Sequence, residues 1–204
     1  MDKKIIVLIL VLILVFILLI HSFLAVTESV PAEVLVVEGW LPDSDLQLAA
    51  YEVKNRNYSQ VITIGGPLSD STSHNKNNAQ QAVQKLISYG VEKNALTAVP
   101  FFKKTKHKTF MSFIALREWI LRSNFPVHSL NIFTGSVHAR KSWTICRRVL
   151  GKRIKIGIIA APAVRYDPQF WWLSKRGIRL VFKNSLGYLY ALFFPWQVLL
   201  GDGL

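Results

Sequence analysis

One short segment of the chain gathers the side chains best suited to acid–base and anion chemistry. Thr134 and Ser136 close an apolar run, and His138, Arg140 and Lys141 follow them. Histidine titrates near neutral pH and therefore suits a general acid or base. Arginine and lysine bind phosphate and carboxylate groups. If Ser136 caps the helix that follows, the free main-chain amides of its first turn would add to an anion-binding pocket.

Two further apolar runs end in residues of the same kind. Glu38, Gly39 and Asp43 follow the first run, and Gly65 and Gly66 follow the second. Glycines let main-chain amides approach an anion closely. The simpler interpretations are an ordinary Gly-Gly turn and a glutamate that caps a neighbouring helix.

The elements that must position these residues alternate between strands and helices. Strands are expected at 33–37, 60–64, 96–99, 130–133 and 154–159, with helices at 44–55, about 78–89, 105–122 and 137–150. This alternation predicts an α/β fold, a Rossmann-like doubly wound and mainly parallel five-stranded sheet, over residues 33–183. Because the carboxyl ends of parallel strands share one edge, the candidate residues should meet there.

An apolar segment precedes this domain. Residues 5–20 contain no polar side chain, and the apolar character continues to about residue 26. A helix of about 20 residues covers about 30 Å, the hydrocarbon thickness of a bilayer. The run exceeds the roughly 7–15 residues of a cleaved signal, and Ala25-Val26-Thr27 is a poor cleavage site. We therefore expect an uncleaved transmembrane signal anchor.

The flanking charges predict the orientation of this anchor. Lys3 and Lys4 precede the span, which favours an N-terminus in the cytoplasm and a domain on the outer side of a bacterial inner membrane. The predicted organisation is a cytoplasmic start (1–4), a transmembrane anchor (5–26), a linker (27–32), the α/β domain (33–183) and an apolar, aromatic C-terminal segment (184–204).

Charge and cysteine content restrict the partners. The chain has 25 Lys and Arg against 12 Asp and Glu; without Lys3, Lys4, Asp2 and Glu28 the balance is 23 against 10, so the whole +13 lies in the exported part. This charge favours membrane lipid head groups and anionic envelope precursors such as polyprenyl phosphates. An exported location argues against nucleic acid. The single cysteine, Cys146, excludes an intrachain disulfide and should be a small buried hydrophobe.

The C-terminal segment has three interpretations. Residues 186–200 are almost wholly apolar and rich in aromatic side chains, with Pro195 interrupting them. They could form a helix lying on the membrane or beside the anchor, with Arg176, Arg179 and Lys183 facing head groups. A last helix buried in the domain fits the composition equally well, and a second membrane span is the third interpretation.

Several motifs together resemble a known family. They are Val36-Val37-Glu38-Gly39-Trp40-Leu41-Pro42-Asp43, Ile64-Gly65-Gly66-Pro67, Thr134-Gly135-Ser136-Val137-His138-Ala139-Arg140-Lys141-Ser142, Tyr166-Asp167-Pro168, Trp171-Trp172 and Gly187-Tyr188-Leu189-Tyr190. Over roughly residues 33–195 the chain resembles the SanA/ElyC/YdcF-like envelope family, in the branch with a Val-Glu-Gly-Trp first loop. The resemblance implies a Rossmann-like domain, often membrane-tethered, linked with envelope biogenesis and barrier function. It implies no defined reaction and no cofactor.

The resemblance also assigns pocket residues. It places Glu38, Asp43, Gly65, Gly66, Thr109, His138 and Arg140 in the family's pocket. The chain departs from the family pattern near Thr109, where an acidic or amide residue is usual, and before Gly177, where cations replace an expected carboxylate. These losses argue against a metal site and a two-carboxylate mechanism, and they leave anion binding intact.

Three functions stay open from the sequence. The first is binding of a phosphorylated lipid or glycan precursor through residues Gly39, Asp43, Gly65, Gly66, Thr109, Thr134, Ser136, Arg140 and Lys141. The second is a hydrolase or transferase on such a ligand, with His138 as acid or base, Glu38 orienting a water or nucleophile, and Arg140 clamping a phosphate. The third is a structural scaffold within a membrane complex.

Overall fold

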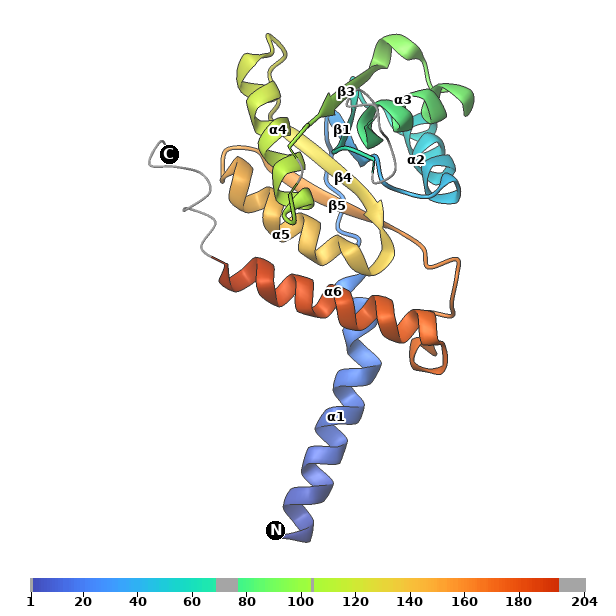
Figure 1. Ribbon diagram of the computed structural model, residues 1–204, viewed down its shortest axis with the longest axis vertical. Coiled ribbons are helices and arrows are strands. Elements are labelled where there is room, and N and C mark those ends of the chain that lie inside the picture. The colour runs from blue at the N-terminus through green and yellow to red at the C-terminus, as the bar shows by residue number, and fades with distance from the viewer. Residues whose placement is uncertain (1, 69–76, 104, 195–204) are drawn as a thin grey trace.

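The computed structural model describes residues 2–68, 77–103 and 105–194, and it contains a single five-stranded sheet between two layers of helices (Figure 1). The strands are β1 (Val34–Glu38), β2 (Gln60–Gly65), β3 (Leu96–Pro100), β4 (Ser129–Gly135) and β5 (Lys155–Ala161). The helices are α1 (Lys3–Leu24), α2 (Asp43–Asn55), α3 (Asn78–Ser88), α4 (Lys108–Arg122), α5 (Ala139–Leu150) and α6 (Lys175–Phe193). Three short 3-10 turns are η1 (Lys93–Ala95), η2 (Ser136–His138) and η3 (Trp171–Leu173).

The strand order is β3-β2-β1-β4-β5, and every neighbouring pair is parallel. The predicted α/β, Rossmann-like fold is therefore confirmed, and the sheet is wholly parallel. The order reverses between β1 and β4, which pair in the register Val37↔Phe133. In a doubly wound sheet, this reversal opens a crevice at the carboxyl ends of the strands.

Strand β1 shows why the sheet is covered on both faces. Val34 and Val36 lie in the core beneath α4 and α5, whereas Leu35 and Val37 lie in the core beneath α2 and α3. Alternate side chains of a strand point to opposite faces, so an all-apolar strand needs a helix layer on each side.

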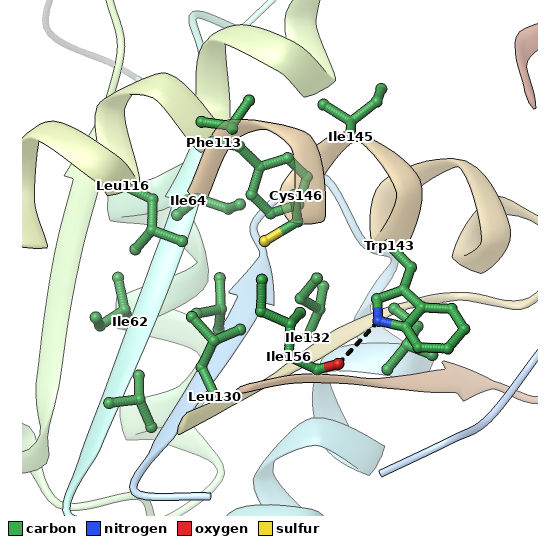
Figure 2. Close-up of a cluster of buried hydrophobic side chains, with 14 of the residues drawn as sticks. Ile62, Ile64, Phe113, Leu116, Leu130, Ile132, Trp143, Ile145, Cys146 and Ile156 are labelled. Atoms are coloured by element: carbon green, nitrogen blue, oxygen red, sulfur yellow. Dashed lines mark hydrogen bonds between the residues drawn. The ribbon is translucent and has the colours of Figure 1, made fainter. Parts of the chain in front are cut away.

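The larger of the two cores lies between the sheet and the α4–α5 layer (Figure 2). Phe113 and Leu116 of α4 pack there with Cys146 of α5, all fully buried. Trp143 donates its indole N–H to the main-chain carbonyl of Ile156, 2.9 Å away, which ties α5 to β5. Cys146 is buried among apolar side chains, as the sequence predicts.

Helix α1 is long and apolar enough to cross a membrane, and it is the one such helix in the described part of the chain. Figure 1 shows it projecting away from the domain. Most of its side chains are exposed. Only its C-terminal end packs against the domain, where His21 and Leu24 are buried. The linker that follows forms an antiparallel bridge between Glu28 and Ile158 of β5.

Helix α6 runs without a break through the domain boundary that the sequence suggested at 183/184. Ser174 caps it by accepting a hydrogen bond from the amide of Gly177. The helix packs against α5, α1, η2 and η3, so it lies beside α1, at the end of the domain from which α1 projects (Figure 1). Residues 195–204, with Pro195 and Trp196 of the aromatic segment, lie outside the described residues.

Candidate functional site

A cavity of about 550 Å³ opens at the carboxyl ends of the strands, beside the reversal between β1 and β4. Its size is typical of small-molecule sites. The lining comes from the strand ends, from the first turns of α3, α4 and α5, from the segment after β5, and from α6. The residues are Trp40, Pro42, Asp45, Gly65, Gly66, Asn78, Lys108, Thr109, Ser112, Gly135, Ser136, Val137, His138, Lys141, Pro162, Ala163, Val164, Arg165, Tyr166, Arg176, Leu180, Lys183, Asn184 and Gly187.

The charges along this lining are mostly positive. Its five cations come from α4, α5, the segment after β5 and α6, and they face a single lining carboxylate, Asp45. The cations are Lys108, Lys141, Arg165, Arg176 and Lys183. Burial lowers the pKa of Lys141, nearby Glu38 opposes this, and Lys183 lowers it further. Bringing like charges together at a partly buried site is unfavourable unless an anion joins them, so the cavity suits a negatively charged ligand.

Behind the cavity wall, Glu38 accepts hydrogen bonds from two hydroxyl groups. Its side chain is buried, and it receives bonds from Thr134 at the end of β4 and from Ser142 of α5, the latter at 2.8 Å. The pairing of β1 with β4 brings Glu38 beside Thr134, and the helix after β4 brings Ser142 over both. A buried carboxylate requires such donors.

His138 lies between this carboxylate and the cavity. Its Nδ1 is 2.9 Å from Oδ1 of Asn184 on α6, and its Nε2 is 3.8 Å from Oε2 of Glu38. Burial lowers the pKa of His138; Glu38 and the Asn184 hydrogen bond oppose this, while Lys141 and Lys183 reinforce it. A neutral ring with its proton on Nδ1 follows, since Asn184 offers an acceptor there, and the contact with Glu38 is then not an ion pair.

The Nε2 atom of His138 consequently carries a lone pair. It is the buried side-chain nitrogen or oxygen without a hydrogen-bond partner in the described part of the chain. The edge of Trp40 packs against the imidazole, with 4.9 Å between ring centroids, and limits its rotation. The arrangement can take up one proton or accept one hydrogen bond.

No model of a known protein family and no curated protein sequence matches this chain.

Ser136 has a role other than the one its sequence position suggests. It adopts a positive φ of 29° and opens the turn η2, so α5 begins at Ala139 and Ser136 does not cap it. Its side chain instead lies near Tyr166; burial raises the pKa of Tyr166, and the Ser136 hydroxyl opposes this rise. The Tyr166 hydroxyl also lies 3.1 Å from Nε2 of His21, which links the cavity wall to α1.

The structure brings together most of the residues predicted to form the site. Six of them line the cavity: Gly65, Gly66, Thr109, Ser136, His138 and Lys141. Glu38 and Thr134 lie directly behind its wall. The remaining three, Gly39, Asp43 and Arg140, lie outside its lining.

Each of these three residues has another partner. A Cβ on Gly39 would meet the carbonyl oxygen of Asn78 at 2.5 Å, so this glycine allows α3 to approach the end of β1. Asp43 forms an exposed ion pair with Lys85 at 3.0 Å. Arg140 donates from Nε to the main-chain carbonyl of Phe23 at 2.8 Å. Its guanidinium also lies 4.4 Å from the centroid of the Phe23 ring, so it holds α1 instead of reaching into the cavity.

Close packing also explains the two strand-end glycines. A Cβ on Gly66 would come within 2.2 Å of the ring of Phe101, and one on Gly65 within 2.8 Å of the Cβ of Asn78. A larger residue at either position would push the neighbouring segments apart, so the close packing beside the cavity requires glycine at both.

The cavity also uses residues that the sequence analysis did not assign to it. Arg165 and Asn184 were not singled out. Arg176 and Lys183, which face lipid head groups in one of the three interpretations of the C-terminal segment, line the cavity. Asn184 had a detectable signal, since it is the polar residue among otherwise apolar positions on the buried side of α6. Among the described residues, no three His, Cys, Asp or Glu side chains are close enough together to hold a metal ion.

Proposed function

We propose that this protein is a membrane-anchored component of the bacterial cell envelope that binds a phosphorylated, anionic lipid or glycan precursor in the cavity at the carboxyl edge of its sheet. In this proposal, α1 spans the inner membrane with its N-terminus in the cytoplasm, and the domain lies on the outer side. The observation that carries it is the convergence of Lys108, Lys141, Arg165, Arg176 and Lys183 around one cavity.

Two further features support an anionic ligand. Burial lowers the pKa of both Lys141 and His138, because their charged forms lack solvation in the free protein. An anion would supply the missing counter-charge, so its binding should favour protonation of both side chains. The resemblance of the Glu38 and His138 segments to the SanA/ElyC/YdcF-like family supports an envelope role, and we propose membership of that family.

The test is the thermal stability of the full chain in mild detergent with polyprenyl phosphates, nucleotide sugars and inorganic phosphate. A ligand present at about 100 times its dissociation constant should add roughly 2.7 kcal/mol to the free energy of unfolding. Arg176→Gln and Lys183→Gln should abolish this gain, and Lys93→Gln, on an exposed side chain of η1, should retain it. Absence of a gain with every ligand would refute the proposal and favour a scaffold.

A second candidate function rests on the array around His138. Asn184 fixes one ring nitrogen, Glu38 lies behind the other, and the neutral ring has a lone pair on Nε2. Nε2 is buried beside Glu38, so a water or hydroxyl nucleophile has to reach this atom first. The histidine can then remove its proton as it attacks a phosphoryl group, with cavity cations stabilising the negative charge. Release of phosphate or of a transferred group by the wild type, lost in His138→Asn, would establish a hydrolase or transferase. Tight binding without turnover would exclude it.

A further inference from the structure

Helix α6 has two unlike faces. Leu180, Lys183, Asn184 and Gly187 line the cavity. On the other side of the helix, apolar side chains that recur every three or four residues are exposed. They are Ile178 (46% exposed), Phe182 (64%), Leu186 (52%), Leu189 (47%) and Phe193 (81%). We call these five residues the α6 outer stripe.

The α6 outer stripe lies at the end of the domain from which α1 projects. Figure 1 shows α6 crosswise to α1 at this end, with the sheet and the other helices beyond it. Phe170 and Leu173, beside and within η3, are 50% and 78% exposed, which extends the apolar surface next to α6. Trp172, which is partly buried, lies between them, and tryptophan side chains gather at the boundary of a membrane.

The anchor is too short to hold this surface away from a membrane. The indole N–H of Trp171 donates to the main-chain carbonyl of Ile17, 3.2 Å away. From Lys3 to Ile17 there are 14 helical steps (17 − 3), which rise only about 21 Å at about 1.5 Å each. The hydrocarbon core of a bilayer is about 30 Å thick. With the lysines at the cytoplasmic boundary, Trp171 would therefore reach only the outer leaflet, and any tilt of α1 would place it deeper.

The charges of α6 fit the same position. The helix contains no Asp or Glu, and Lys175, Arg176, Arg179 and Lys183 are all exposed near its N-terminal half. Basic residues beside an apolar stripe are typical of helices that lie in the plane of a membrane surface, where anionic head groups attract the cations.

We propose that the α6 outer stripe, together with Phe170 and Leu173, is embedded in the outer leaflet, at and just below its head groups, so that a lipid bilayer covers it. This inference rests on the membrane-spanning role of α1 in the proposed function. It places Arg176 and Lys183, and with them one wall of the cavity, at the depth of lipid head groups. A ligand could then enter the cavity while its lipid tail stays in the bilayer.

The test uses single reactive cysteines in the full chain, reconstituted into vesicles of phosphatidylethanolamine and phosphatidylglycerol. Cys146 is fully buried, so a fluorophore added to the folded protein reports on the introduced cysteine. Phe182→Cys and Leu189→Cys probe the α6 outer stripe. Leu10→Cys, at a 60% exposed position, probes the middle of α1, and Tyr51→Cys, at a 68% exposed position of α2, probes the far side of the domain.

Lipids with a nitroxide at the head group or deep in the acyl chain then report the depth of each fluorophore. We expect head-group nitroxides to quench positions 182 and 189 at least two-fold more than deep ones, deep nitroxides to quench position 10, and neither to quench position 51. Quenching at position 10 with none at 182 and 189 would overturn the inference and leave the anchor intact. If neither lipid nitroxides nor water-soluble iodide quench positions 182 and 189, a protein surface covers the stripe, and this result also overturns the inference. Absence of lipid quenching at position 10 would refute the anchor itself.

Discussion

Nδ1 of His138 lies 2.9 Å from Oδ1 of Asn184, and this contact joins the edge of the sheet to a helix that begins 37 residues further along the chain (175 − 138). Because α6 also supplies Arg176 and Lys183, the cavity is complete only when α6 is docked on the domain. The surroundings of His138 at the sheet edge therefore depend on α6, the helix that we place against the membrane.

Loss of the Glu38 carboxylate should destabilise the fold. Glu38→Ala would leave the hydroxyls of Thr134 and Ser142 without their acceptor inside the protein and would open a small cavity. We expect a loss of about 3 kcal/mol in the free energy of unfolding, measured by urea denaturation in detergent. The matched control is Asp43→Ala, which removes an exposed carboxylate of an ion pair and should change stability little. Equal effects of the two substitutions would contradict the buried array.

The stability of the protein should fall as the pH drops below about 7. Burial holds the pKa of His138 below its ordinary value of 6.5, so between these two values the unfolded chain binds a proton that the native state resists. The free energy of unfolding then decreases on acidification, by up to about 1.4 kcal/mol per pH unit for one proton. His138→Gln should flatten the slope between pH 7.5 and 5.5, measured by urea denaturation. An unchanged slope in this variant would show that another group is responsible; His128→Gln, at an exposed position, is the control.

Arg140 should matter for the junction between α1 and the domain more than for the ligand. Arg140→Met removes the hydrogen bond to the carbonyl of Phe23 and the contact with its ring, worth about 1–2 kcal/mol together. Amide hydrogen exchange over residues 17–25 should accelerate by roughly ten-fold, while ligand affinity stays close to wild type. Arg147→Met is the control, because Arg147 stacks on Trp143 of the same helix, 4.7 Å from the ring centroid. A loss of ligand binding in Arg140→Met with unchanged exchange would reverse this assignment.

Substitution by alanine should have opposite effects on stability at two glycines of α6. In Gly177→Ala the new Cβ would lie 2.3 Å from the main-chain carbonyl oxygen of Trp171, which has little freedom to move, so we expect a loss of about 1–3 kcal/mol. In Gly187→Ala the closest atom is Cδ of Lys141 at 3.2 Å, part of a flexible side chain. The better helix propensity of alanine should make that variant at least as stable as wild type, while displacement of Lys141 weakens anion binding. Thermal unfolding and ligand titration of both variants test the pair, and equal stabilities would contradict the close packing at Gly177.

The fold could be predicted from local patterns to within a few residues. The apolar run at 130–133 and the helical periodicity of 105–122 correspond to β4 and α4, which begins three residues later, at Lys108. These patterns are local because a strand or helix must place its own apolar residues on the buried face. Less predictable was the continuity of α6 through residue 183, since the apolar, aromatic run from residue 186 suggested a separate segment.

For the site, the sequence determined which residues stand at the strand ends. Parallel strands must bring their carboxyl ends to one edge, so Gly65 and His138, which follow two different strands, lie beside the same cavity. The direction of each side chain is set by contacts between distant segments. Arg140 turns to Phe23, 117 residues away in the chain, whereas Lys141 points into the cavity.

Local patterns in the chain predict an apolar helix long enough to cross a membrane, an alternating α/β domain and a polar sheet edge, because hydrophobic periodicity and strand-end position are properties of short segments. Three features depend instead on how distant elements dock: α6 completes the cavity, Asn184 pairs with His138, and Trp171 donates to the carbonyl of Ile17. Such contacts form where docking buries the most apolar surface and leaves the fewest polar groups unpaired, which is a condition on the whole chain that no single segment reveals.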